Sequence, residues 1–185
     1  MSYAIVCDAV KSVKRKYCES DPFRLCRDMG IKLIPYSFGT DPDAIKGFYS
    51  ENFRIRTIIF NSDLPKVIQK IIVAHELGHA VLHRKSGFQG FHDYALFNEC
   101  VNTEKEANLF AAELLLEDED VLEALNMDTT FFSAAAALSV PMELLDFKFR
   151  IMKWRGYKLV EPPISAQSNF LAAMEVPNDE DCYGI

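Results

Sequence analysis

Residues 71–83 read IIVAHELGHAVLH, and this stretch decides the fold that we expect for the chain. From Leu64 onward the apolar residues recur at helical spacing, which predicts one amphipathic helix, capped by Asp63 or Ser62, that contains His75 and His79. Positions i and i+4 of an α-helix lie on one face roughly 6 Å apart, so the two imidazoles can converge on one ion. The spacing therefore predicts a metal site on this helix.

Glu76 lies beside the first of these histidines and completes the pattern HExxH. Its carboxylate can reach a water molecule on the metal and take its proton, as a general base does in metal-assisted hydrolysis. Zinc suits the site because imidazole nitrogens bind it at about 2.0 Å, although manganese and other first-row ions accept the same ligands. Gly78 costs about 1 kcal/mol relative to alanine inside a helix, which indicates that another segment approaches it closely.

A catalytic zinc needs a third protein ligand and an open position for water. We favour Glu104, in a helix predicted over residues 103–120, because Asn108 follows on the same face and can hydrogen-bond a ligand imidazole. His92, in the segment between the two helices, is an alternative ligand. Glu106 is another, although it points about 160° away from Asn108 around the helix axis.

His83 continues the histidine series, but it cannot share an ion with His75 because their Cα atoms are about 12 Å apart along the helix. Leu82 and Lys85 stand where the pattern HExxHxxGxxH requires Gly and His, which excludes the metzincin arrangement. We therefore expect His83 to be a neighbour of the cleft. The candidates to contact the substrate or stabilise the oxyanion, each of which could equally be a packed or surface residue, are Tyr94, His92 and His83.

The remaining patterns predict a sheet followed by helices. Runs with the composition of strands occupy residues 31–36, 47–50 and 54–61. Further helices are expected at residues 3–17, 22–29, 129–138 and 141–154, the second of them capped by Asp21 and stopped by Gly30. This order predicts an α+β fold, with a small N-terminal three-stranded sheet packed on a mainly helical, zincin-like domain. We expect a single domain over residues 1–160 and a loosely held C-terminal tail over residues 161–185.

Composition narrows the class of protein. The chain has 185 residues, 20 of them Lys or Arg and 27 Asp or Glu, so its formal net charge is −7. The five cysteines are scattered and odd in number, which is typical of reduced thiols. No stretch approaches the ~20 apolar residues of a membrane span, and charges stand where a signal peptide would be apolar. We therefore expect a cytoplasmic protein that does not bind membranes.

A local basic cluster runs against the acidic balance of the chain. We interpret the cluster as a solvated helix face, because exposed helix positions three and four residues apart are usually charged. An acidic chain also disfavours a phosphate-binding surface, so we expect no direct contact with nucleic acid. The members of the cluster are Lys148, Arg150, Lys153, Arg155 and Lys158.

The chain resembles the ImmA/IrrE family of metallopeptidases. The segments that carry the resemblance are GFYSENFRIRTIIFNSDLP (47–65), IIVAHELGHAVLH (71–83), TEKEANLFAAELLLED (103–118) and LSVPMELLDFKFRIMKW (138–154). The resemblance extends from about residue 21 to residue 155. It implies that Glu104, the first Glu of the ExEAN-like stretch, is the third metal ligand. The family often has LLMP where this chain has LLLED, a difference that alters the helix end and no ligand.

Members of this family resemble gluzincins in their metal site and commonly occur beside helix-turn-helix repressors, in phages, mobile elements and stress-response loci. The resemblance implies a zinc-dependent endopeptidase that cleaves a partner helix-turn-helix repressor at a specific site and so acts as an anti-repressor. Two alternatives stay open: a regulatory module that sequesters its partner without hydrolysis, and a toxin-like or general peptidase. Glu76 argues against the first, because binding alone needs no general base.

Overall fold

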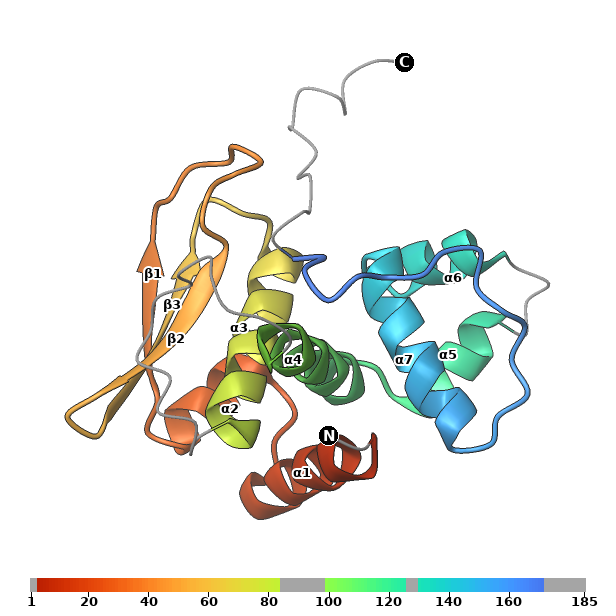
Figure 1. Ribbon diagram of the computed structural model, residues 1–185, viewed down its shortest axis with the longest axis horizontal. Coiled ribbons are helices and arrows are strands. Elements are labelled where there is room, and N and C mark those ends of the chain that lie inside the picture. Colours follow the sequence, from red (N-terminus) through yellow and green to blue (C-terminus); the bar gives the residue numbers. More distant parts are fainter. Residues whose placement is uncertain (1–2, 84–98, 126–129, 172–185) are drawn as a thin grey trace.

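The computed structural model describes residues 3–83, 99–125 and 130–171. Within these ranges a three-stranded sheet lies at one end of the molecule (Figure 1). Two helices, α3 (Lys66–Leu82) and α4 (Glu99–Leu115), lie in the middle. The other end is formed by α5 (Asp118–Leu125), α6 (Phe131–Ala137) and α7 (Met142–Trp154). The α+β fold is therefore confirmed. No helix in the described ranges has the length and apolar character that crossing a membrane requires.

The sheet consists of β1 (Lys32–Tyr36), β2 (Gly47–Asn52) and β3 (Ile55–Asn61), in the order β1-β3-β2. β3 pairs in parallel with β1 and antiparallel with β2. The central position suits β3, because most of its residues are β-branched or aromatic and both Ile58 and Phe60 are buried. All three strands lie where the sequence predicts them.

The first two helices also match their predictions. α1 extends over Tyr3–Tyr17 and buries Val6, Val10 and Val13 along one stripe. α2 extends over Pro22–Asp28, and the Asp21 carboxylate accepts a hydrogen bond of 3.0 Å from the Arg24 N–H, as an N-cap does. Gly30 follows the helix with a positive φ of 68°, a conformation that glycine adopts without strain.

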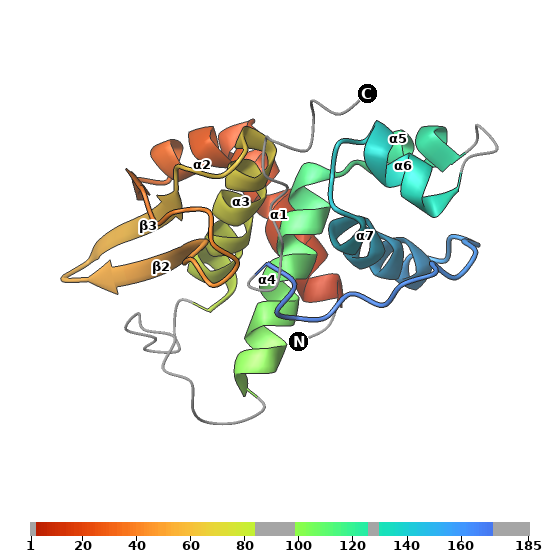
Figure 2. The same ribbon diagram turned by 90° about the horizontal axis from the view of Figure 1, so that it is seen from above.

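α3 (Lys66–Leu82) is the central helix of the molecule. It lies between the sheet and α4 (Glu99–Leu115), as the two perpendicular views in Figures 1 and 2 show. A helix covered on both sides must be apolar around most of its circumference, which explains the unbroken run of buried residues from Ile71 to Gly78. This burial places His75 and Glu76 in the interior, and His79 is partly buried.

The predicted cap of α3 is wrong. The helix begins after Pro65, and no side chain of the described residues caps it. The Asp63 carboxylate instead accepts hydrogen bonds from the Gly39 N–H (2.8 Å) and the Ser37 hydroxyl (2.7 Å). Asp63 therefore secures the loop after β1, and Pro65, which has no N–H to satisfy, suits the position where the helix starts.

Gly78 is a point of close approach between α3 and α4, as its place inside the helix indicates. A Cβ atom built on Gly78 would lie 3.1 Å from the Ala107 Cα and 3.1 Å from the Phe110 Cβ. Both atoms belong to a packed helix and cannot move aside easily. The glycine therefore allows α4 to approach the two histidines of α3.

Replacing Gly78 with Val is expected to lower the free energy of unfolding by about 1–3 kcal/mol, because the added carbons overlap the α4 backbone. Urea unfolding of the protein in a chelator measures this change without a contribution from metal binding. Ala137→Val, at an exposed position of α6, is the control for adding a β-branched residue to a helix. Equal stability of the two variants would contradict the close approach.

The single helix predicted over residues 103–120 is two helices. α4 ends at Leu115, and α5 extends over Asp118–Leu125. Three acidic residues, Asp118, Glu119 and Asp120, form the first turn of α5, where the helix dipole favours negative charge. The same residues would be unfavourable at the C-terminal end of a longer helix, which accounts for the break.

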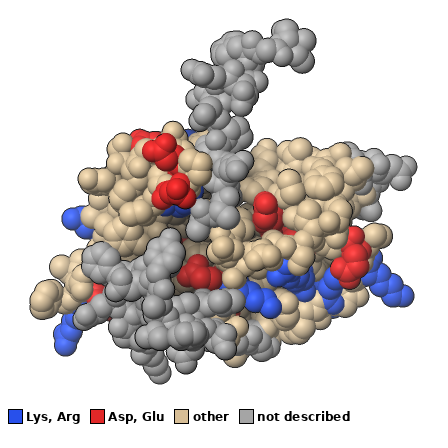
Figure 3. Space-filling view, turned by 45° about the horizontal axis from the view of Figure 1, so that its top comes forward, with Lys and Arg blue, Asp and Glu red and all other residues tan. Residues whose placement is uncertain are grey.

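α6 (Phe131–Ala137) and α7 (Met142–Trp154) confirm the last two predicted helices, but the solvated basic face predicted on α7 is wrong for Lys148 and Arg155. Lys148 is only 1% exposed, and its ammonium group lies 2.8 Å from Glu113 and 2.6 Å from Asp118. The Arg155 guanidinium contacts the same two carboxylates. Figure 3 shows basic side chains gathered on the half of the molecule formed by α5–α7, with acidic ones among them.

This ion network is expected to make stability depend on pH. Burial alone would raise the pKa of Asp118, but Lys148 and then Arg155 outweigh it and lower the pKa. A carboxyl group with a depressed pKa in the folded state stabilises the fold above its unfolded value of about 3.9 and loses this contribution as the pH falls further. We expect Asp118→Asn to cost about 1–3 kcal/mol at pH 7 and less at pH 3.

Urea unfolding at pH 7, 5, 4 and 3 measures this dependence. Asp120→Asn, an exposed acid of the same helix turn, is the matched control. If wild type and Asp118→Asn lose stability in parallel over this range, the Asp118 contacts contribute nothing to acid sensitivity.

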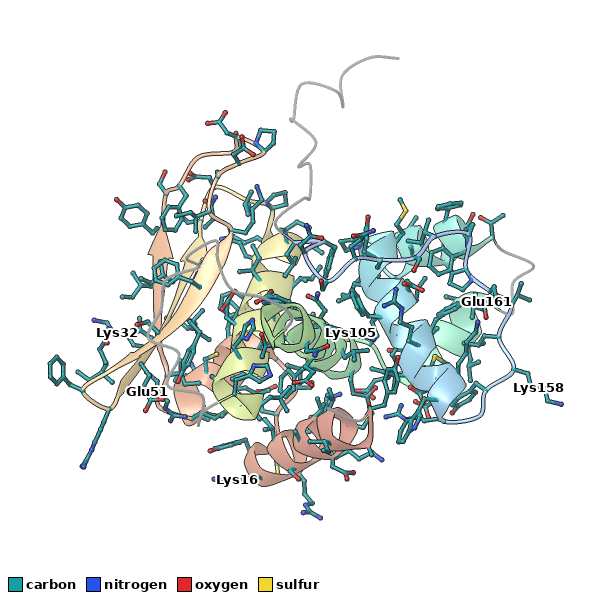
Figure 4. All side chains as sticks on the ribbon, in the orientation of Figure 1. Lys16, Lys32, Glu51, Lys105, Lys158 and Glu161 are labelled. Carbon is teal, nitrogen blue, oxygen red and sulfur yellow. The ribbon has the colours of Figure 1, made fainter. Side chains whose placement is uncertain are left out.

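The segment after α7, whose residues from 161 onward were predicted to form a loose tail, is held by contacts in its described part. Lys158 and Glu161 lie along the outer edge of the molecule (Figure 4), and Glu161 is 2.6 Å from Lys153. The chain then returns toward α4 (Figures 1 and 2), where Phe170 and Leu171 are buried. Residues 172–185 lie outside the described ranges. The domain boundary at residue 160 stays a prediction.

Candidate metal centre

Two adjacent helices bring three potential metal ligands together. His75 and His79 project from one face of α3, and Glu104 reaches them from the first part of α4. The two Nε2 atoms are 3.1 Å apart, and each lies 3.2 Å from an oxygen of Glu104. Among the described residues, these three form the one group of His, Cys, Asp or Glu that could hold a metal ion.

The donor set fits a divalent cation such as zinc. Two imidazole nitrogens and one carboxylate oxygen are the ligands of catalytic zinc sites that leave one position open. Burial alone would raise the pKa of Glu104, but the facing His75 and His79 rings outweigh it and lower the pKa, so Glu104 is ionised. A cation would bring these three donor atoms to a common centre.

Glu76 lies beside this group in a protected environment. It is 5% exposed, and the backbone N–H of Tyr49, in β2, donates a hydrogen bond to its carboxylate. Burial, with a smaller contribution from the charge of Glu104, raises the pKa of Glu76 to about 7. A cation at the neighbouring ligands would favour the ionised form and lower this pKa. With a cation bound, Glu76 is therefore a carboxylate at neutral pH, the form that can accept a proton as a general base.

The predicted hydrogen bond between Asn108 and a ligand histidine has the expected geometry. Asn108 is fully buried on α4, and its Oδ1 lies 2.7 Å from the Nδ1 of His75. With Nδ1 engaged by the amide, the Nε2 atom of His75 faces His79 and Glu104. Such an outer contact orients the ring and sets which nitrogen carries the proton.

His79 has a corresponding support made of His83 and Glu106. The Glu106 carboxylate lies 2.9 Å from the Nε2 of His83, which must donate because a carboxylate only accepts. Burial lowers the pKa of His83 despite its bond to Glu106, so the ring is neutral near pH 7 and its Nδ1 is an acceptor. This Nδ1 is 3.1 Å from the Nδ1 of His79. His79 therefore donates there through Nδ1, and its Nε2 is the nitrogen left to bind a cation beside Glu104.

These contacts bear on part of the alternatives left by the sequence. The Glu106 carboxylate lies against His83 and outside the group of three. The Nδ1 and Nε2 atoms of His83 both have neighbours, and its predicted contact with substrate or oxyanion stays a prediction. His92 and Tyr94 lie outside the described residues. Sequence reasoning missed the contacts of His83 with His79 and Glu106. The i, i+4 spacing of His79 and His83 was a signal for the first of these contacts.

Three features occur together: the HExxH residues of α3, including the buried Glu76, and a glutamate from the following helix. This combination defines the class of metallopeptidases whose metal site is formed by two histidines and a glutamate. The chain belongs to the Peptidase_M78 family, since residues 26–150 match the family model for the IrrE N-terminal-like domain. The resemblance to the ImmA/IrrE family is thus confirmed.

A relative among phage proteins supports the same assignment. The chain is 34% identical over 146 residues to the "Uncharacterized immunity region protein 2" of Bacillus phage phi105. The match covers 79% of this chain and 90% of the phage protein. The similarity therefore includes nearly the whole relative.

Proposed function

We propose that the chain is a zinc-dependent endopeptidase, with manganese or another divalent metal as a possible substitute, that cleaves a partner helix-turn-helix repressor at a specific site. The observation that carries this proposal is the meeting of His75, His79 and Glu104 beside a buried Glu76. The family assignment supports peptidase chemistry, and the name of the phage relative supports a role in phage immunity.

In the proposed mechanism, Glu76 handles the proton. A divalent cation held by the three ligands would polarise the scissile carbonyl and lower the pKa of a water molecule toward about 7. The Glu76 carboxylate accepts a proton from the attacking water and returns it to the leaving amine nitrogen. The Tyr49 N–H fixes the orientation of this carboxylate. His83 and Asn108 fix the orientation of the two imidazoles.

The proposed partner follows from charge as well as from the family. The net charge of −7 disfavours a direct contact of this chain with DNA, and it favours attraction to the basic surface of a DNA-binding domain. A repressor is present where the DNA is, so we propose that the chain acts in the cytoplasm.

Incubating the zinc-loaded protein with any helix-turn-helix repressor encoded beside its gene tests this proposal. We expect one cut in the repressor, located by mass spectrometry, and no digestion of casein. Glu76→Gln is expected to leave the repressor intact. Equal inactivation of the repressor by wild type and Glu76→Gln without any cut would show sequestration instead, and digestion of casein would show a general peptidase.

A further inference from the structure

The segment after α7 reaches the metal centre through Asn108. The Nδ2 of Asn108 donates a hydrogen bond of 2.6 Å to the backbone carbonyl of Ser168, while its Oδ1 faces the His75 ring. Ser168 is 60 residues distant from Asn108 in sequence and lies outside residues 26–150, which match the family model. The contact therefore joins Asn108, within the matched residues, to a segment that the family model does not include.

The carbonyl of Ser168 determines which way the Asn108 amide points. Oxygen and nitrogen of an amide are exchangeable by a flip, but a backbone carbonyl only accepts hydrogen bonds. The NH₂ group of Asn108 must therefore face Ser168, and its oxygen must face His75. The Nδ1 of His75 then has to donate, so Nε2, which faces Glu104, is the nitrogen left to bind a cation.

Several contacts hold this segment in place. The Asp146 carboxylate on α7 accepts a hydrogen bond of 2.9 Å from the Ala166 N–H, and Arg150 donates one of 2.8 Å to the Ala166 carbonyl. Phe170 is 5% exposed, and its ring centre lies 5.7 Å from that of Phe147. Ser168 lies between these two anchors, so its carbonyl has a defined position beside α4.

We propose that the segment 165–171 positions His75 for metal binding: the Ser168 carbonyl orients the Asn108 amide, which holds His75 in the form with its proton on Nδ1. The inference rests on the proposed function, because it concerns the same metal. Asn108 and Ser168 are positioning residues. They act on the metal through the His75 ring.

Truncation tests this role. Removing residues 164–185 deletes the segment, and removing residues 172–185 is the matched control that keeps every contact described here. We expect the longer deletion to weaken Zn²⁺ binding about 10–100-fold relative to the control, as measured by competition with a chelator. NMR of the imidazole nitrogens in the zinc-loaded protein is expected to show a protected proton on the Nδ1 of His75 in the control and a faster-exchanging one after the longer deletion.

A double-mutant cycle separates positioning from a general loss of stability. In the Asn108→Ala background the longer deletion is expected to change zinc affinity by less than about twofold, because the route to His75 is already cut. An equal loss of affinity in both backgrounds would overturn the inference, as would no loss in either. The same cycle can use Phe170→Ala in place of the longer deletion, with the exposed Asn169→Ala as its control, so that the protein is not shortened.

Different results would overturn the proposed function and the role of residues 165–171. Wild-type protein that binds no divalent metal would overturn the proposed function and this inference together. Wild-type protein that binds zinc and cleaves the repressor, but shows no coupling between the segment and Asn108, would overturn the inference alone.

Discussion

Glu76→Gln is expected to keep the metal bound and to lower the rate of peptide hydrolysis by about 10²–10⁴-fold. Glutamine has nearly the same shape as glutamate, and its side-chain oxygen can still accept the hydrogen bond from the Tyr49 N–H. An amide cannot take a proton from water, so the step assigned to Glu76 is lost. The three ligands do not change, and zinc content should remain that of the wild type.

Single-turnover cleavage of the repressor, followed alongside zinc content, measures both parts of this prediction. Glu119→Gln makes the same chemical change at an exposed position of α5 and is the matched control. Wild-type cleavage by Glu76→Gln would remove the general base from the mechanism. Loss of zinc from Glu76→Gln would assign this residue a structural role in the metal centre.

Glu104→Ala is expected to weaken zinc binding by more than about 100-fold and to abolish hydrolysis. Loss of an outer contact such as that of Asn108 changes metal affinity about 10–100-fold. Loss of a direct ligand should weaken metal binding more than that. Two imidazoles remaining on α3 give only two of the three protein ligands that a catalytic zinc requires. Competition with a chelator of known affinity measures the change.

Glu119→Ala is the control for removing a glutamate from a helix on the surface. Glu104→Ala with the affinity of the wild type would contradict the ligand assignment. If His92→Ala then lost zinc, the third ligand would be His92, the alternative that the sequence leaves open. Loss of zinc in Glu104→Ala and not in His92→Ala is the result that we expect.

The local parts of the fold and of the site follow from sequence periodicity. His75 and His79 were predicted to converge because four residues nearly complete one helical turn, and Gly78 indicated the close neighbour that proved to be α4. Asn108 was placed from its i+4 relation to Glu104. Each of these inferences uses spacing along a single helix, which the order of residues determines.

Contacts between distant segments were beyond such reasoning. Lys148 has the spacing of an exposed helix residue, and only the fold brings Glu113 and Asp118 to it and allows its burial. The Tyr49 N–H and the Ser168 carbonyl are backbone groups. Nearly every residue has such groups, so the residue type does not indicate which of them contacts the site. These contacts depend on how segments distant in sequence pack together, and no pattern within one segment predicts them.

Anomalous scattering at the zinc edge from crystals of the zinc-loaded protein tests the central claim most directly. We expect one peak per chain at about 2.0–2.2 Å from the Nε2 of His75, the Nε2 of His79 and an oxygen of Glu104. A peak elsewhere in the molecule, or zinc bound by the two histidines while the Glu104 side chain turns into solvent, would contradict it.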